Sequence, residues 1–169
     1  MRMTLLESLY RGKLTEAAPR VSDAEKAALV SELDRVALRK LGRSLAIREV
    51  DAGSCNGCEL EIIALSNVLY DLERFGLKIV ASPRHADIML VTGPVTRNME
   101  AATRLAFDAM PEPKFVVAVG DCACDGGPFA ASPECRGGAS AILPVALRIP
   151  GCPPSPADLL KRLITLIDA

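Results

Sequence analysis

The sequence predicts an α/β fold, a parallel sheet with helices on both faces, preceded by an N-terminal helical extension. From residue 45 onward, short apolar runs alternate with segments whose apolar residues recur at helical spacing. This alternation is typical of parallel sheets, because a helix usually carries the chain from one parallel strand to the next. The chain has 169 residues, half of them hydrophobic, which is enough to bury one substantial core.

Charge and composition narrow the range of functions. The net charge is -1 and no basic stripe is present, which argues against nucleic acid as a partner. No apolar run approaches the roughly 18 residues of a transmembrane helix, and Glu7, Arg11 and Lys13 interrupt any signal-peptide-like core. We therefore expect a cytoplasmic protein. In that reducing compartment six cysteines indicate metal or redox chemistry rather than disulfides.

Residues 1–44 are expected to form an arm and a helix that contact a partner, and residues 45–169 to form the functional domain. The segment Ser22-Asp23-Ala24-Glu25 has the form of a capping box, and apolar residues at helical spacing follow it. Gly42 suits the position after a helix end. These signals predict a helix over 23–41.

The remaining elements follow in order. Strands are expected at 45–50, 77–81, 87–92, 114–119 and 142–149, the last interrupted by Pro144. Helices are expected from near Asn56 to Gly76, over 97–109, and from Pro156 to the end. The residues predicted to face the core are Ile62, Leu65, Leu69 and Leu72 in the first helix, Met99, Ala102, Leu105 and Ala106 in the second, and Leu159, Leu160, Leu163 and Ile167 in the third.

Four cysteines occupy loops that directly follow predicted strands. Cys55 and Cys58 stand in Gly53-Ser54-Cys55-Asn56-Gly57-Cys58-Glu59 after the first strand, Cys122 follows the fourth, and Cys152 follows the fifth. Ligands of parallel sheets bind outside the carboxyl ends of the strands. One edge of the sheet is therefore expected to collect all four thiols.

Four thiolates suit either a structural zinc or an iron–sulfur cluster. Zinc modules typically use two local pairs, whereas here one C-x-x-C pair is joined by two distant single cysteines in glycine-containing loops. Glycines let the backbone approach closely and direct N–H groups at cluster sulfurs. The pattern favours an iron–sulfur cluster over zinc, and both over a set of merely buried cysteines.

Several motifs resemble one family. They are Asp-Ala-Gly-Ser-Cys-Asn-Gly-Cys-Glu-Leu-Glu-Ile (51–62), Ser-Pro-Arg-His-Ala-Asp-Ile (82–88), Val-Thr-Gly-Pro-Val-Thr (91–96), Gly-Asp-Cys-Ala (120–123) and Ile-Pro-Gly-Cys-Pro-Pro-Ser-Pro (149–156). In this order they resemble the complex I 20 kDa subunit family, which includes the small subunits of membrane-bound [NiFe]-hydrogenases. The resemblance implies a flavodoxin-like fold and one [4Fe–4S] cluster. Its implied ligands are Cys55, Cys58, Cys122 and Cys152, beside the catalytic site of a larger partner.

The spacing of the first cysteine pair bears on the branch of that family. Respiratory complex I subunits have two adjacent cysteines there, whereas the form Cys-Asn-Gly-Cys-Glu resembles the energy-converting (group 4, formate hydrogenlyase-like) hydrogenases. The resemblance thus implies a subunit that passes electrons between ferredoxin-like subunits and a Ni–Fe large subunit. Membrane subunits would be reached only indirectly, on the cytoplasmic side. The alternatives are a complex I-like subunit that passes electrons to quinone and, from another class, a zinc-stabilised interaction module.

The other candidate residues are expected at or around this site. Glu59 is expected to be either a helix-terminal acid stabilised by the helix dipole or, as the resemblance implies, a proton relay beside the catalytic subunit. Cys124 and Cys135 are expected not to bind the cluster. His85, the only histidine, and Arg84 are expected to make surface or interface contacts.

Overall fold

A computed structural model of the protein describes residues 44–168 as a five-stranded parallel sheet with the strand order β2-β1-β3-β4-β5. The strands are β1 (Leu45–Asp51), β2 (Leu77–Ile79), β3 (Ile88–Thr92), β4 (Phe115–Val119) and β5 (Val145–Ile149). All neighbouring strands run parallel. This order is that of flavodoxin-like sheets, which confirms the predicted fold class. The predicted arm and the helix over 23–41 lie outside the described residues.

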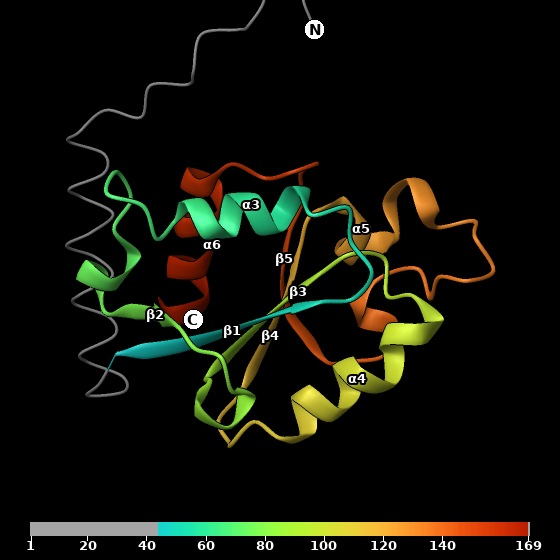
Figure 1. The fold of residues 1–169 in the computed structure, drawn as a ribbon, viewed down its shortest axis with the longest axis horizontal. Helices are drawn as coiled ribbons and strands as arrows, with labels where there is room; N and C mark the ends of the chain where they lie inside the picture. Colours follow the sequence, from blue (N-terminus) through green and yellow to red (C-terminus); the bar gives the residue numbers. More distant parts are fainter. Residues whose placement is uncertain (1–43, 169) are drawn as a thin grey trace, which may run out of the picture.

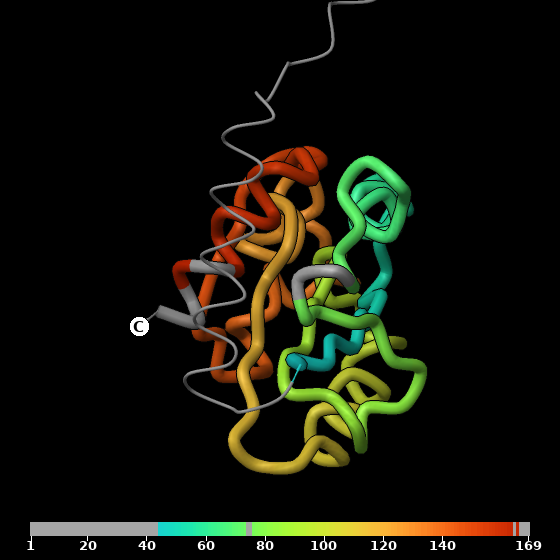
Figure 2. The backbone as a smooth tube through the Cα atoms, turned by 90° about the vertical axis from the view of Figure 1, so that its left-hand side faces the viewer, coloured from blue at the N-terminus to red at the C-terminus, as the bar shows by residue number. Residues whose placement is uncertain are grey.

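Helices cover both faces of the sheet. Helices α3 (Gly57–Ala64) and α6 (Pro156–Asp168) lie on one face, and α4 (Arg97–Asp108) and the short α5 (Asp121–Asp125) on the other (Figure 1; Figure 2). Two groups of buried apolar side chains result, one on each face of the sheet. The first includes Ile62 of α3 with Leu159 and Leu163 of α6, and the second includes Met110 and Ala123.

The central strands are apolar on both faces because both faces are covered. All five residues of β3 and four of the five in β4 are buried. Continuous apolar strands of this kind are typical of parallel sheets between helix layers. The edge strand β5 instead alternates between exposed and partly buried residues until Ile149.

The first helix is shorter than predicted. It ends at Ala64, and the chain then turns before a 3-10 helix, η1, over Leu72–Phe75. Asn67 stabilises this turn, because its Oδ1 accepts hydrogen bonds from the backbone N–H of Leu69 (2.8 Å) and of Tyr70 (3.1 Å). The prediction that Leu69 faces the core is therefore wrong, and its side chain is 74% exposed.

The inward face of α4 is only in part the predicted one, because Met99 and Ala106 pack against the core but the other two residues do not. Ala102 and Leu105 are exposed, whereas Thr103 is fully buried between them. The Thr103 hydroxyl donates a hydrogen bond to the carbonyl of Met99 (2.8 Å), so its burial leaves that polar group satisfied. A threonine thus occupies the core position for which hydrophobicity alone favoured leucine.

Proline shortens the last strand. β5 begins at Val145, after Pro144, and residues Ala139–Ala141 ahead of it form a 3-10 helix, η4. Pro144 has no N–H to donate to a sheet ladder.

None of the helices within residues 44–168 combines the length and the hydrophobicity that a membrane span needs.

Candidate metal centre

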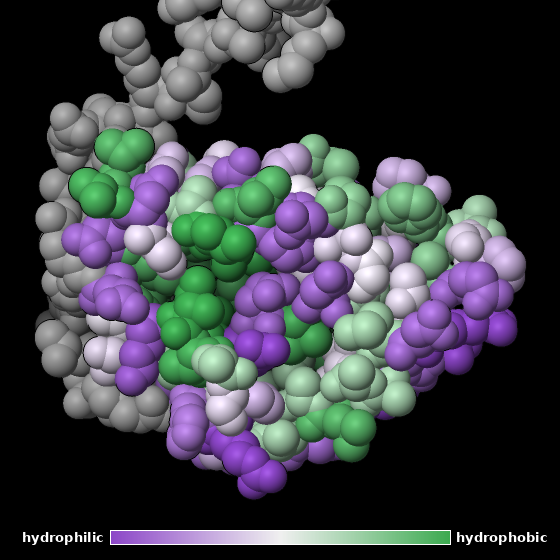
Figure 3. Space-filling model, viewed as in Figure 1, coloured by the Kyte–Doolittle hydropathy of each residue, from purple (hydrophilic) through white to green (hydrophobic). Residues whose placement is uncertain are grey.

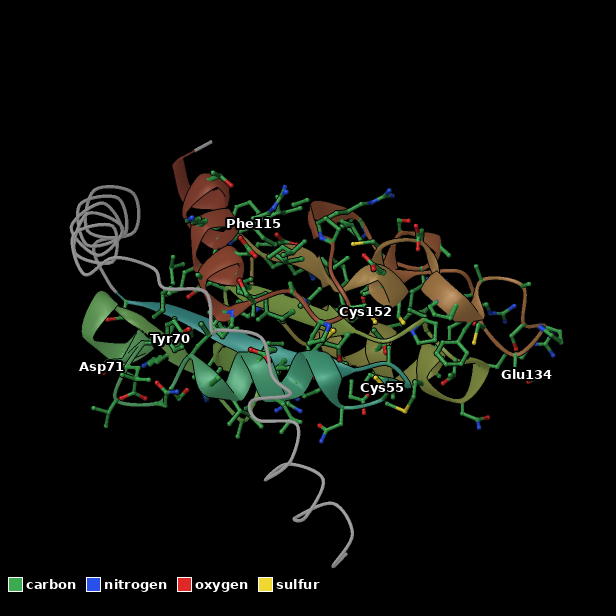
Figure 4. All side chains as sticks on the ribbon, turned by 90° about the horizontal axis from the view of Figure 1, so that it is seen from above. Cys55, Tyr70, Asp71, Phe115, Glu134 and Cys152 are labelled. Carbon is green, nitrogen blue, oxygen red and sulfur yellow. The ribbon has the colours of Figure 1, made fainter. Side chains whose placement is uncertain are left out.

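The four predicted ligands lie on loops at the carboxyl edge of the sheet. The loop after β1 carries Cys55 and leads to Cys58 in the first turn of α3, α5 after β4 carries Cys122, and the turn after β5 carries Cys152. Figure 4 places Cys55 and Cys152 toward the same end of the molecule, away from Tyr70. Cys58 and Cys122 are half-buried, and Cys55 and Cys152 are exposed.

The first half of the site, residues 51–58, is built by local hydrogen bonds. Asp51 ends β1, and its Oδ1 accepts from the backbone N–H groups of Gly53 and Ser54, both at 2.7 Å. The Ser54 hydroxyl in turn accepts from the N–H of Asn56 (3.1 Å). Asn56 has a positive φ of 70°, a conformation that asparagine tolerates better than most residues. These turns direct the chain from β1 into α3.

The segment after β3 fits closely beneath this loop. The N–H of Ala52 donates to the carbonyl of Thr92, and the N–H of Thr96 donates back to the carbonyl of Ala52, both at 2.9 Å. Gly93 has a φ of 82°, and a Cβ there would lie 2.7 Å from the backbone nitrogen of Ser54. Only glycine allows that approach. The bend at Gly93-Pro94 thus supports the first half.

The second half of the site joins residues 120–127 to residues 149–154. The N–H of Gly120 donates to the carbonyl of Ile149 (2.8 Å), which extends the pairing of β4 with β5. One residue further, the N–H of Asp121 donates to the carbonyl of Gly151 (2.9 Å), and Asp121 Oδ1 accepts from the N–H of Gly151 (2.7 Å). The short helix α5, which the sequence did not predict, begins at Asp121.

The two halves meet at Cys58. A Cβ on Gly120 would lie 2.5 Å from the sulfur of Cys58, so the backbone of the second half closely approaches a thiol of the first. A Cβ on Gly127 would lie 3.2 Å from the sulfur of Cys122. These glycines leave space for sulfur atoms where a side chain would fill it.

The electrostatics place the four thiols near one another. Burial raises the pKa of Cys58 to about 12, and Glu59, Cys122, Cys55 and Cys152 contribute to that rise, in that order. Burial also raises the pKa of Cys122, with Cys152 and Cys55 as the next largest causes. The structure therefore places the four predicted residues at the same edge of the sheet. Among the described residues, however, no group of three or more Cys, His, Asp or Glu is close enough to hold a metal ion, so the ligand set stays a prediction.

The other two cysteines have different surroundings. Cys124 is buried in the core beneath α5, where burial raises its pKa, and its Sγ contacts the carbonyl of Ala118 at 3.8 Å. Side chains two positions apart on a helix point in different directions, which separates Cys124 from Cys122. Cys135 is half-buried, and its backbone pairs with Thr96.

Two acids lie beneath the first half. Glu59 is only 7% exposed, and neither carboxylate oxygen has a hydrogen-bond partner among residues 44–168. Glu49 on β1 is half-buried, and Thr92 Oγ1 donates to its Oε1 at 3.4 Å. Burial raises the pKa of Glu49, and the neighbouring Glu59 and Asp51 raise it further. Sequence reasoning missed Glu49, although its register with the buried Leu45 and Ile47 places it on the core-facing side of β1.

Arg84 and His85 do not belong to this site. They lie in the 3-10 helix η2 (Pro83–His85), and both side chains are exposed. That helix leads into the amino end of β3, whereas the cysteines gather at the carboxyl ends. Their interface role stays a prediction.

These observations define a class of protein, flavodoxin-like domains whose cysteines gather at the carboxyl edge of a parallel sheet. The family model described as NADH ubiquinone oxidoreductase, 20 Kd subunit, matches residues 55–166. The chain belongs to this family. It is a family of subunits from oxidoreductase complexes.

Individual relatives come from more than one kind of complex. The probable membrane-bound hydrogenase subunit mbhJ of Pyrococcus furiosus is 45% identical over 76% of this chain and 77% of its own length. Formate hydrogenlyase subunit 7 of Escherichia coli is 49% identical over 73% of this chain, and the match spans about half of that protein (48%). An NADH-quinone oxidoreductase subunit of Clostridium beijerinckii is 46% identical over 64% of this chain and 65% of its own length.

A solved structure supports the fold. A chain of the membrane-bound sulfane sulfur reductase, an archaeal respiratory membrane complex, superimposes with a TM-score of 0.65 and 33% sequence identity. The superposition covers 81% of this chain and 76% of the other. The predicted family and the predicted fold class are thus confirmed.

Proposed function

We propose that this chain is the electron-transfer subunit of a membrane-bound [NiFe]-hydrogenase complex, with one [4Fe–4S] cluster held by Cys55, Cys58, Cys122 and Cys152. The observation that carries the proposal is the convergence of these four thiols, from segments after three different strands, at one edge of the sheet. The cluster, when bound, accepts and returns single electrons.

The donor set fits such a group. A thiolate is repelled by other negative charges close to it. After burial and Glu59, the neighbouring thiols therefore raise the pKa of Cys58 further. Coordination to metal ions supplies positive charge that reverses this effect and leaves thiolates. The glycines at 120 and 127 leave room beside Cys58 and Cys122. The chain's own part is therefore to hold four thiols in place and to limit water around the inner two.

A partner subunit must supply the catalytic chemistry. The described residues place apolar side chains on the surface next to the first half, as Figure 3 shows over α3 and the turn that follows it. Leu60 and Ile63 are 58% and 62% exposed, and Val68 is 97% exposed. Exposed apolar patches of this kind are typical of protein interfaces. We propose that the large catalytic subunit covers this edge, that ferredoxin-like subunits supply the electrons, and that membrane attachment is through partners.

Glu59 keeps its proposed role as a proton-carrying acid beside the catalytic subunit. Its burial with no hydrogen-bond partner in the described part of the chain supports a role beyond that of a helix-terminal acid stabilised by the helix dipole, because such burial is costly. Mutation of Glu59 to Gln should then lower the turnover of the complex and leave its iron content unchanged.

Serine substitutions of the six cysteines test the ligand set. Replacement of Cys55, Cys58, Cys122 or Cys152 should reduce the iron content and the low-temperature EPR signal of the anaerobically purified complex. Replacement of Cys124 or Cys135 should leave both unchanged, which makes these two the matched controls. A colourless protein that contains zinc would contradict the proposal and favour the zinc-stabilised module.

The nickel content of the active complex separates the two redox alternatives. The Cys55-Asn56-Gly57-Cys58 spacer favours the hydrogenase branch, whereas the family description and the 46% identity to an NADH-quinone oxidoreductase subunit favour a quinone-reducing complex. We expect nickel in the intact complex. An active complex without nickel would reverse this choice.

A further inference from the structure

Asp121 makes the closest connection between the loops that carry Cys122 and Cys152. Its backbone N–H donates to the carbonyl of Gly151, and its carboxylate accepts from the N–H of the same residue, at 2.9 and 2.7 Å. One residue that follows β4 therefore binds both backbone polar groups of one residue that follows β5. The two residues are 30 positions apart in the sequence.

The need for this contact follows from the path of the backbone. At Gly120, with a φ of 86°, the chain leaves the direction of β4 and turns into α5. If β4 continued past Gly120, its next backbone carbonyl would accept a hydrogen bond from β5. The turn at Gly120 directs that carbonyl away from β5. The Asp121 carboxylate supplies the missing acceptor, so the half-buried N–H of Gly151 stays paired.

Both thiols of the second half lie one residue beyond this contact. Cys122 follows Asp121, and Cys152 follows Gly151. The separation of their backbones is thereby set by two hydrogen bonds rather than by the length of two flexible loops.

We propose that Asp121 is a positioning residue that fixes Cys122 and Cys152 relative to each other and lowers the reduction potential of the group they hold. This inference rests on the proposed function. The first effect comes from the hydrogen bonds to Gly151. The second comes from the negative charge beside Cys122, because negative charge disfavours the addition of an electron.

Two substitutions separate the effects in the full chain, purified anaerobically within its complex. Asp121→Asn keeps an oxygen that can accept from Gly151 and removes the charge. We expect an unchanged iron content, an unchanged rate of iron loss to a chelator, and a midpoint potential shifted to more positive values in EPR-monitored redox titration. Asp121→Ala removes the acceptor as well, and we expect iron loss to a chelator to be about 10-fold faster.

The matched control is Asp108→Asn, which removes the same charge from an exposed position at the far end of α4. It should change neither the potential nor the rate of iron loss. An Ala variant that holds iron as firmly as the wild type, or an Asn variant that loses it as fast as the Ala variant, would overturn the positioning role. If the Ala variant does not assemble, the Asn variant decides, since an unshifted potential refutes the charge effect. Absence of iron from the wild-type complex would instead refute the proposed function itself.

Discussion

The two halves of the cysteine site, residues 51–58 and residues 120–127 with 149–154, are built in different ways. In the first half, Asp51 accepts from N–H groups two and three residues ahead, so a short peptide segment determines its shape. In the second half, Asp121 accepts from Gly151, which the pairing of β4 and β5 brings next to it. The first half is a local turn that the segment after β3 supports, whereas the second half exists only when β4 and β5 have paired.

The halves also differ in charge. Glu49 and Glu59 lie beneath the first half, in the layer between the sheet and α3. In the second half, Asp121 lies beside Cys122. Burial raises the pKa of the nearby Cys124, and the positive charge of Arg148 lowers it by a smaller amount. Because their hydrogen bonds and their charges differ, the two halves should be sensitive to different substitutions.

The largest effect is expected where the halves touch. Gly120→Ala should strongly reduce the iron content of the purified protein, because the new methyl group would occupy space 2.5 Å from the sulfur of Cys58. The backbone angles of Gly120, φ 86° and ψ 158°, lie in a region that is essentially restricted to glycine, and a side chain there adds about 1–3 kcal/mol of strain. Iron analysis and circular dichroism together distinguish loss of the site from loss of the fold.

Gly137→Ala is the matched control for this substitution. Gly137 also has a positive φ, 80°, but a Cβ there would meet no atom within 4 Å. The Gly137→Ala variant should also introduce backbone strain at a positive φ, but it should keep its iron. Equal iron losses in the two variants would show that strain, and not contact between the halves, decides the outcome.

A smaller effect is expected from the local turn. Asp51→Ala removes the acceptor of two hydrogen bonds, and each contributes about 1 kcal/mol to stability. We expect a midpoint of thermal unfolding lower by about 2–4 °C per kcal/mol lost. Asp51→Asn retains an acceptor and should recover much of the loss, and an Asn variant as unstable as the Ala variant would contradict the hydrogen-bond explanation.

The smallest effect is expected from the acid beneath the first half. The pKa of Glu49 is raised in the folded protein, above all by burial and then by Glu59 and Asp51, although Thr92 and Arg48 oppose the shift. Folding therefore favours the protonated form, so this group costs stability as the pH rises through its unfolded pKa toward its folded pKa. Glu49→Gln should then raise the free energy of unfolding at pH 7 and leave it unchanged below about pH 4.

Denaturant unfolding at the two pH values measures this difference. Glu73→Gln, at an exposed position of η1, is the control and should show no such pH dependence. A Gln variant at position 49 that is less stable than the wild type at pH 7 would show that the Glu49 carboxylate is instead needed in its charged form.

Much of this architecture could be predicted from local patterns. The strands predicted at 87–92 and 114–119 agree within one residue with β3 and β4, because both faces of a central parallel strand are apolar. The convergence of the cysteine loops followed from the rule that carboxyl ends of parallel strands share an edge.

Other features depended on side-chain hydrogen bonds that a hydrophobic pattern does not contain. Asn67 stabilises the turn after α3 by binding two backbone N–H groups, and Thr103 enters the core because its hydroxyl binds the preceding turn. The contact between Asp121 and Gly151 was also not predictable, since it depends on how far two chain segments travel beyond their strands.

The distance between the cysteines along the chain has a consequence for assembly. Cys55 and Cys152 are 97 positions apart (55 to 152), and the last of them is held in place by the final strand of the sheet. Contacts of such high sequence separation form late, because the entropy of closing long loops must first be overcome. A nascent chain thus cannot present all four thiols together until β5 has been synthesised and has joined β4. Any group that binds all four thiols therefore stabilises, by mass action, the sheet in which β5 is already paired with β4.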